Sequence, residues 1–339
     1  PSEDDQSKML KKLNYKSLND LINNTVPEKI QFKGELNIGE SNSEYEALRK
    51  LKAISKKNEI YSNFIGMGYY GTYTPYVILR NILENPGWYT SYTPYQPEVA
   101  QGRLEMLLNF QQMIVDFTGM DIANASLLDE GTAAAEAMGL SYRLDKSDSN
   151  LVFVSENCHP QTVEVIRTRA EPMGLKVLVG NEDKVLEQLK EDIVCGILQY
   201  PGTLGDIKDP SEAISKIHKK NGKAILACDL LALAKLKTPR ELGADIAVGS
   251  SQRFGIPMGY GGPHAAFFAT KDEYKRSMPG RIVGVSVDRH GNKAYRLSLQ
   301  TREQHIRRDK ATSNICTAQA LLAIVSAAYC IYHLSLIHI

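Results

Sequence analysis

The part of the chain after Asn150 carries the pattern that most restricts the fold. There, short continuous apolar runs alternate with amphipathic stretches. The runs are Leu151–Val154, Lys176–Val179, Ile193–Gln199, Ala224–Cys228, Asp245–Val248 and Ala265–Ala269. Continuous apolar runs are typical of strands buried on both faces, and strand–helix–strand spacing indicates crossover connections. We therefore predict an α/β fold with a mostly parallel sheet and helices on both of its faces.

Helical spacing predicts the elements that accompany this sheet. The clearest helix has Leu104, Leu107, Leu108, Gln111, Ile114 and Val115 on one face and Gly119 just after its end. Further helices are expected from near Gly131, from Asp209–Ser211 to Gly222, and over Ala320–Tyr332. Residues 1–58 are expected to form short charged helices joined by a link at 34–43, as a wrapping arm.

Composition excludes several classes of protein. A formal net charge of +1 gives no electrostatic reason to expect nucleic acid or an anionic membrane as a partner. Five scattered cysteines without a C-x-x-C pair argue against a disulfide framework or a zinc site, so we expect no metal and a cytoplasmic location. The longest apolar stretch, Ala320 to Tyr332, is shorter than the ~20 residues needed to cross a bilayer.

The two ends suggest a fragment. The chain begins at Pro1 rather than at Met, and residues 334–339 follow a helix without a stop signal. We therefore expect a truncated protein with three parts. Residues 1–100 would form the arm and an interface segment, 101–318 a large domain, and 319–339 the start of a linker helix to a small carboxyl-terminal domain.

The segment Tyr61–Pro97 is rich in tyrosine, proline and glycine and holds the one tryptophan, Trp88. Such a density of helix and strand breakers argues against long regular elements. Tyrosines in loops suit a contact surface or a pocket lining, because each offers an apolar ring with a polar tip.

Three candidate binding positions lie just after predicted strands or at the start of predicted helices. Gly131 and Thr132 start an alanine-rich helix, where they would either bind a small anion or make a tight turn into a core helix. His159 follows the first apolar run and would face the ligand crevice or only begin the next helix. Asp229 ends another run and would either hold a protonated ring nitrogen or cap a helix.

Two other stretches stand out. Residues 249–264 contain five glycines and two prolines directly after a predicted strand, which specifies a shaped backbone rather than a generic loop. Basic residues recur between Arg302 and Lys310, but Glu303 and Asp309 interleave them. A salt-bridge network is therefore favoured there over a nucleic-acid patch.

Long motifs in this chain closely resemble the P-protein family of the glycine cleavage system. They lie at residues 64–70, 92–98, 123–136, 251–264 and 300–315, and the likeness runs from about residue 28 to about residue 333. The resemblance implies an aspartate-aminotransferase-like fold, the fold type I of pyridoxal-phosphate-dependent transferases. It also implies decarboxylation of glycine on pyridoxal phosphate, with transfer of the aminomethyl group to the lipoyl arm of H-protein.

The family has two homologous halves, and the resemblance implies that one of them carries the Schiff-base lysine. In the frame Phe254-x-Ile256-Pro257-x-Gly259-x-Gly261-Gly262-Pro263, Ser251 and Gln252 stand where that half has His and Lys. Glutamine has no nucleophilic amine. The chain is thus expected to be the lysine-less amino-terminal half, with vestigial cofactor-site residues Gly131, Thr132, His159 and Asp229 and with pyridoxal phosphate in the partner half.

The resemblance also implies which residues and partners complete the site. Tyr92, Tyr95, Glu98, Tyr69 and Arg103 are expected to be presented across the interface. Phe32–Leu36 resembles a separate subunit 1, which implies a heterotetramer with the cofactor-bearing subunit 2. The alternatives are a scaffold half without a catalytic role and an independent pyridoxal enzyme using Lys235 or Lys237.

Overall fold

The chain is divided into two compact units. The computed structural model describes residues 1–34, 36–64, 66–89, 94, 96–300, 306, 308–313 and 319–333. The first unit is Pro1–Ser62 and the second is Asn63–Ile339. The division falls within the predicted arm and interface segment of residues 1–100.

The first unit consists of short helices, as the sequence predicts. They are α1 (Glu3–Lys12), α2 (Leu18–Thr25), the 3₁₀ turn η1 (Glu28–Ile30) and α3 (Glu44–Ser55). Ser2 and Ser43 each form a capping box, with Asp5 and Glu46 respectively, and so satisfy free N–H groups at the starts of α1 and α3. None of the residues of α1, α2 and α3 is buried. Local caps rather than a core therefore define these helices.

The second unit contains a seven-stranded sheet in the order β1-β7-β6-β5-β4-β2-β3. Its strands are β1 (Ile122–Ala123), β2 (Leu151–Ser155), β3 (Lys176–Gly180), β4 (Cys195–Tyr200), β5 (Lys223–Cys228), β6 (Ile246–Ser250) and β7 (Ala266–Thr270). Strands β3, β2, β4, β5 and β6 pair in parallel, and β7 pairs antiparallel with both β6 and β1. A separate antiparallel hairpin is formed by β8 (Ile282–Val287) and β9 (Lys293–Ser298).

Helices and short turns connect these strands. They are α4 (Tyr76–Ile78), the π turn η2 (Leu79–Leu83), α5 (Pro86–Tyr89), η3 (Pro97–Val99), α6 (Gln101–Thr118), α7 (Glu130–Leu144), α8 (Pro160–Ala170), η4 (Glu171–Met173), α9 (Glu182–Gln188), α10 (Ser211–His218), α11 (Leu230–Leu233), η5 (Asp272–Tyr274), η7 (Arg308–Lys310) and α12 (Ala320–Tyr332). Gly119 ends α6 in the left-handed region, with φ of 69°, as predicted for a glycine after a helix.

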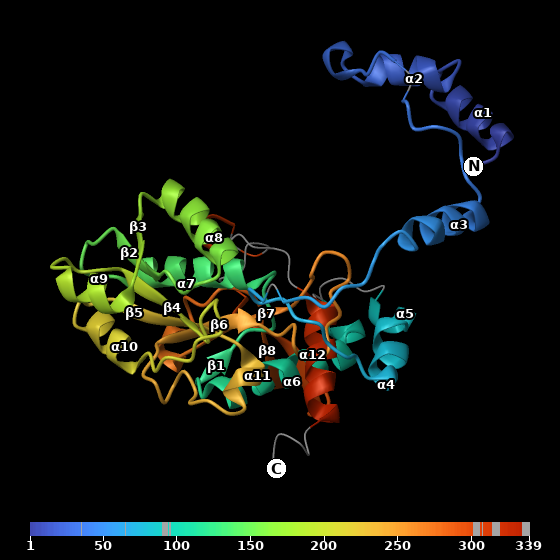
Figure 1. The fold of residues 1–339 in the computed structure, drawn as a ribbon. Helices are drawn as coiled ribbons and strands as arrows, with labels where there is room; N and C mark the ends of the chain where they lie inside the picture. Colours follow the sequence, from blue (N-terminus) through green and yellow to red (C-terminus); the bar gives the residue numbers. More distant parts are fainter. Residues whose placement is uncertain are drawn as a thin grey trace. The chain divides into compact units, whose positions relative to one another are not determined.

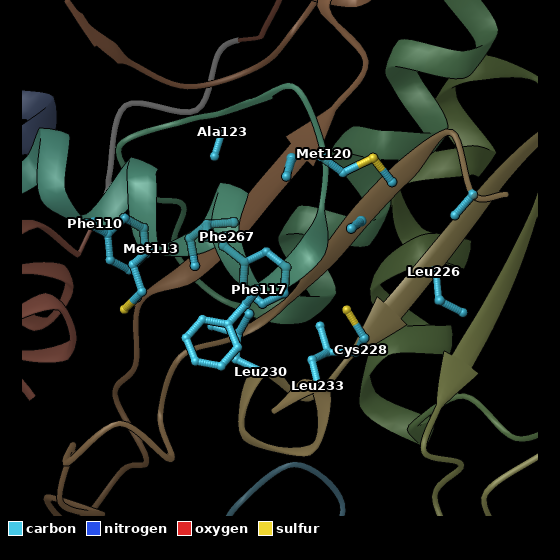
Figure 2. Packing of buried hydrophobic residues seen from close by; sticks show 14 of the residues in the cluster. Phe110, Met113, Phe117, Met120, Ala123, Leu226, Cys228, Leu230, Leu233 and Phe267 are labelled. Atoms are coloured by element: carbon cyan, nitrogen blue, oxygen red, sulfur yellow. The ribbon is translucent and has the colours of Figure 1, made fainter. Parts of the chain in front are cut away.

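The sheet is covered on both faces. Helices α7 and α8 pack on one face, and α6, α10 and α11 pack on the other, with α12 against α6 (Figure 1). Alternate residues of a strand join opposite cores, since Phe153 belongs to one apolar cluster while Val152 and Val154 belong to the other. Figure 2 shows the first cluster, where side chains of α6, α11, β5 and β7 gather.

The sequence predictions of fold class and main elements are confirmed. Each of the six apolar runs forms a strand, and helices form over the four predicted regions. The β8–β9 hairpin was not predicted, because its strands are buried on one face only and so lack a continuous apolar run. In the part of the chain that the structure describes, helices long and apolar enough for a membrane span are absent.

A buried charge cluster ties helix and strand ends together at the edge of the sheet where β5 and β6 begin. Asp245 accepts hydrogen bonds from His218 Nε2 (2.8 Å), the Ala224 N–H (2.8 Å) and Lys271 Nζ (2.5 Å). Burial opposes ionisation of this carboxyl, but the three hydrogen bonds outweigh it and lower the pKa of Asp245 to about 2. A depressed pKa of this kind adds stability above about pH 4, which is lost as the pH falls toward 2.

We predict that Asp245→Asn lowers the free energy of unfolding at pH 7 by roughly 2–3 kcal/mol. This is less than the ~3–5 kcal/mol typical of breaking a buried pair, because Lys271 and His218 are partly exposed and can be rehydrated. Urea unfolding at pH 7 and pH 3 measures the effect, and the gap between wild type and variant should narrow at the lower pH. The matched control Asp209→Asn removes an exposed ion pair with Lys237 and should cost much less. Equal losses in the two variants would contradict the prediction.

Candidate functional site

The candidate site lies where β2, β4, β5 and β6 end and α7 begins. Two cavities of about 110 and 130 Å³ lie there and share the lining residues Gly68, Glu130, His159 and Ser250. Carboxyl ends of parallel strands meet at this edge, which is the usual ligand-binding edge of an open α/β sheet. Chain segments distant in sequence therefore converge on one small volume.

Gln252 organises this volume by binding the backbone. Its side chain is fully buried, accepts a hydrogen bond from the Tyr70 N–H (3.2 Å), and donates to the carbonyls of Tyr70 (2.8 Å) and Ile256 (2.7 Å). An amide carries both donors and an acceptor, so one side chain can hold both polar groups of Tyr70. We call residues 66–74 the closing segment, because Gln252 fixes this segment over the strand ends.

Further contacts hold the closing segment. Thr72 and Thr74 donate to the carbonyls of Ile256 and Gly255, each at 2.6 Å. The Tyr70 ring lies under the Arg253 guanidinium, 4.9 Å from ring centroid to Cζ. Gly262 has φ of 65°, and a Cβ there would lie 2.6 Å from the Tyr69 ring. The glycine-rich stretch 249–264 is thus shaped to receive this segment.

Asp229 is engaged by protein groups at both carboxylate oxygens. Oδ1 accepts from the Leu231 and Ala232 N–H groups at the start of α11, and Oδ2 accepts from Arg253 Nη1 at 2.7 Å. The helix-capping alternative for Asp229 is therefore observed, together with an ion pair that the sequence reasoning did not foresee.

His159 begins α8 and points its ring into the site. The Thr203 hydroxyl lies 2.9 Å from the Asn157 carbonyl and 2.8 Å from His159 Nδ1. Both hydrogen bonds form together when the ring proton is on Nδ1, and in that tautomer Nε2 is an acceptor. Burial lowers the pKa of His159, which keeps the ring neutral.

Glu130 is the buried acid of the site. It is the first residue of α7, and its backbone N–H donates to His264 Nε2 at 3.3 Å. Burial raises the pKa of its carboxyl to about 7, although a hydrogen bond with the Gln199 side chain opposes the shift. Its Oε1 lies 3.9 Å from His159 Nε2 and has no hydrogen-bond partner among the described residues.

The predicted site residues fall into two groups. Gly131, His159 and Tyr69 line one cavity, and His159 and Asp229 line the other. Gln252 lines neither cavity but is hydrogen-bonded to Tyr70, which lines the second. The Thr132 N–H is bound by the helix-capping Asp129, as in a tight turn into a core helix. Glu98 is exposed in η3 and Arg103 is half-buried in α6, away from the cavity linings. Tyr92 and Tyr95 lie outside the described residues.

Sequence reasoning missed Glu130, Tyr70, Arg253 and Gln199. Glu130 and Arg253 stood inside recognised motifs, but nothing local marks an acid as buried or a cation as paired. Within the described ranges, no group of three or more His, Cys, Asp or Glu side chains is placed to hold a metal ion.

Comparison with known proteins now decides the family. The family model described as "Glycine cleavage system P-protein" matches residues 1–336. The chain belongs to the P-protein family. Glycine dehydrogenase (decarboxylating) of Pelagibacter ubique is 85% identical over 98% of this chain, and that of Synechocystis is 60% identical over the same share. The chain spans about a third of the length of these P-protein relatives, 35% and 34% respectively.

Solved structures agree with this assignment. A glycine decarboxylase P-protein in inhibitor-bound form superimposes with a TM-score of 0.89 at 35% identity, over 98% of this chain and 76% of that one. A sphingosine-1-phosphate lyase of Burkholderia pseudomallei has a TM-score of 0.56 at 14% identity, over 90% of this chain and 72% of that one, and shows the shared fold alone. The fold is that of the fold type I pyridoxal-phosphate enzymes.

The residues of this P-protein half do not fit covalently held pyridoxal phosphate. Gln252 stands at the position where the resemblance places the lysine, and its side-chain amide is hydrogen-bonded to the closing segment. Asp229 is already neutralised by Arg253. The two cavities, about 110 and 130 Å³, are small beside the roughly 300–1,000 Å³ of typical small-molecule sites.

We predict that Glu130→Gln stabilises the chain above pH 7 and not at pH 5. Folding raises the pKa of the Glu130 carboxyl. The contribution of this group to the free energy of unfolding is therefore complete below the pKa that it has in the unfolded chain, and it is lost as the pH rises through about 7. Glutamine does not ionise, so the variant keeps this stability at high pH. Its free energy of unfolding should exceed that of wild type by about 2–3 kcal/mol at pH 8. Urea unfolding in sodium buffers at pH 5 and pH 8 measures this. A wild-type stability that does not change between these pH values would refute the assignment.

Proposed function

We propose that this chain is the lysine-less half of a glycine decarboxylase and completes the active site of a second, cofactor-bearing half. The whole enzyme would decarboxylate glycine on pyridoxal phosphate and pass the aminomethyl group to the lipoyl arm of H-protein. The names of the relatives, glycine dehydrogenase (decarboxylating), support the activity. The single observation that carries the division of labour is the burial of Gln252 as a backbone ligand at the position of the lysine.

The remaining lysine candidates do not favour an independent enzyme. Lys235 and Lys237 are exposed, and neither lines either cavity. Lys237 forms an ion pair with Asp209 at 3.1 Å. Neither lysine stands in the frame of residues 251–263, where the resemblance places the Schiff-base lysine.

The partner half would correspond to a part of the relatives' length that this chain does not cover. We propose a cytoplasmic assembly, either as separate subunits in a heterotetramer or with both halves on one polypeptide. Exposed apolar side chains between residues 64 and 89 support a protein partner, since Phe64, Tyr73, Tyr76 and Tyr89 are all more than half exposed.

Glu98 is the described residue best suited to act across such an interface. It is exposed in the middle of η3, and the following helix α6 has no side-chain cap hydrogen bond at its start. Glu98 is therefore not engaged as the hydrogen-bonding cap that would explain it without a partner. The flanking Pro97 stiffens its backbone and would hold the carboxylate in a fixed place.

We predict that the chain gains no lysine-linked label when it is incubated with pyridoxal phosphate and then reduced with borohydride. The reason is that Gln252 offers no amine at the cofactor position. Peptide mass spectrometry reads the outcome, with the cofactor-bearing half as the positive control. Stoichiometric labelling of Lys235, Lys237 or any other lysine would overturn the proposed division of labour.

We predict that Glu98→Gln and Tyr95→Phe each lower the turnover number of the two-half enzyme about tenfold or more, equivalent to ~1.4 kcal/mol of barrier. The assay is glycine-dependent exchange of labelled bicarbonate, and gel filtration checks that the halves stay together. Glu171→Gln is the control, because it changes an exposed acid in η4, before the edge strand β3. Full activity in both test variants within an intact complex would leave this half a scaffold.

A further inference from the structure

The larger of the two site cavities presents an excess of hydrogen-bond acceptors. Glu130, His159 and Gln199 all line this cavity of about 130 Å³. Glu130 Oε1 and Gln199 Oε1 are buried and have no hydrogen-bond partner among the described residues. His159 Nε2 is a third acceptor in the tautomer that donates from Nδ1 to Thr203. Buried acceptors without donors are costly and call for a donor from outside the chain.

The charge of the cavity wall points to the same kind of ligand. Arg253 is the one cationic side chain among the lining residues of this cavity, and Asp229 already neutralises it at 2.7 Å. Ionised Glu130 therefore leaves the wall with one uncompensated negative charge. A ligand that carries one positive charge and only donors would complement both the charge and the three acceptors.

We propose that this cavity binds a small primary ammonium group. An ammonium nitrogen has three N–H donors and no acceptor, which matches Glu130 Oε1, Gln199 Oε1 and His159 Nε2. The volume equals about four water molecules at roughly 30 Å³ each, so the ligand carries at most a short tail. The ammonium ion and methylammonium have this chemistry throughout, and glycine has it at its ammonium end only. The proposal concerns this half's own cavity and stands whether or not the half contributes to turnover.

Ligand-dependent thermal unfolding of the 339-residue chain at pH 8 tests the proposal. Ammonium, methylammonium and glycine are compared at equal millimolar concentration and fixed ionic strength. At least one of them should raise the midpoint with saturation, and isothermal titration should give one site per chain. The ranking of the three identifies the source of the ammonium group. Tetramethylammonium, which has no N–H, and potassium should give no shift.

Two variants localise the site. Glu130→Gln should weaken binding tenfold or more, and Gln199→Leu, which removes an acceptor together with the hydrogen bond to Glu130, should weaken it several-fold. Glu182→Gln is the matched control, since that buried carboxylate is already bound by Ser155 and Lys208 outside this cavity. No saturable shift with any of the three ligands, an equal shift with potassium or tetramethylammonium, or unchanged binding in Glu130→Gln would each overturn the proposal.

Discussion

The hydrogen bonds between the Gln252 side chain and the backbone of Tyr70 are the constraint on which the site depends. They fix a segment of irregular backbone over the end of the sheet and pair both backbone polar groups of Tyr70. The Arg253–Tyr70 contact and the Gly262–Tyr69 approach both follow from that placement. The side-chain amide of Gln252 thus joins the closing segment to the strand ends.

The buried carboxyl groups at the two ends of the parallel strands have different hydrogen-bonding surroundings. At the starting edge, Asp245 has three donors and its pKa falls to about 2. At the opposite edge, Glu130 has a shortage of donors, so burial raises its pKa to about 7. The first arrangement is that of a structural tie, where every acceptor is satisfied. The second is that of a site that keeps a capacity for binding.

The sequence predicted the layers of the fold because their signals are local. Continuous apolar runs marked β2, β4 and β5, and helical spacing with Gly119 marked α6. The site was predicted only in outline. The resemblance indicated that Gln252 replaces a lysine, but its partner Tyr70 is 182 residues away in sequence, so its role as a backbone ligand has no local signal. The state of Glu130 likewise depends on burial by segments that only the folded chain brings together.

The hydrogen bonds that hold the closing segment join atoms of this chain, and that has a consequence for how their contribution to stability responds to small molecules. A protein that binds a cofactor gains stability in proportion to the logarithm of the cofactor's concentration, and it loses that gain when supply fails. The hydrogen bonds of Gln252, Thr72 and Thr74 carry no such dependence. The stability that these hydrogen bonds contribute is therefore set by the sequence of the chain and not by the concentration of a small molecule.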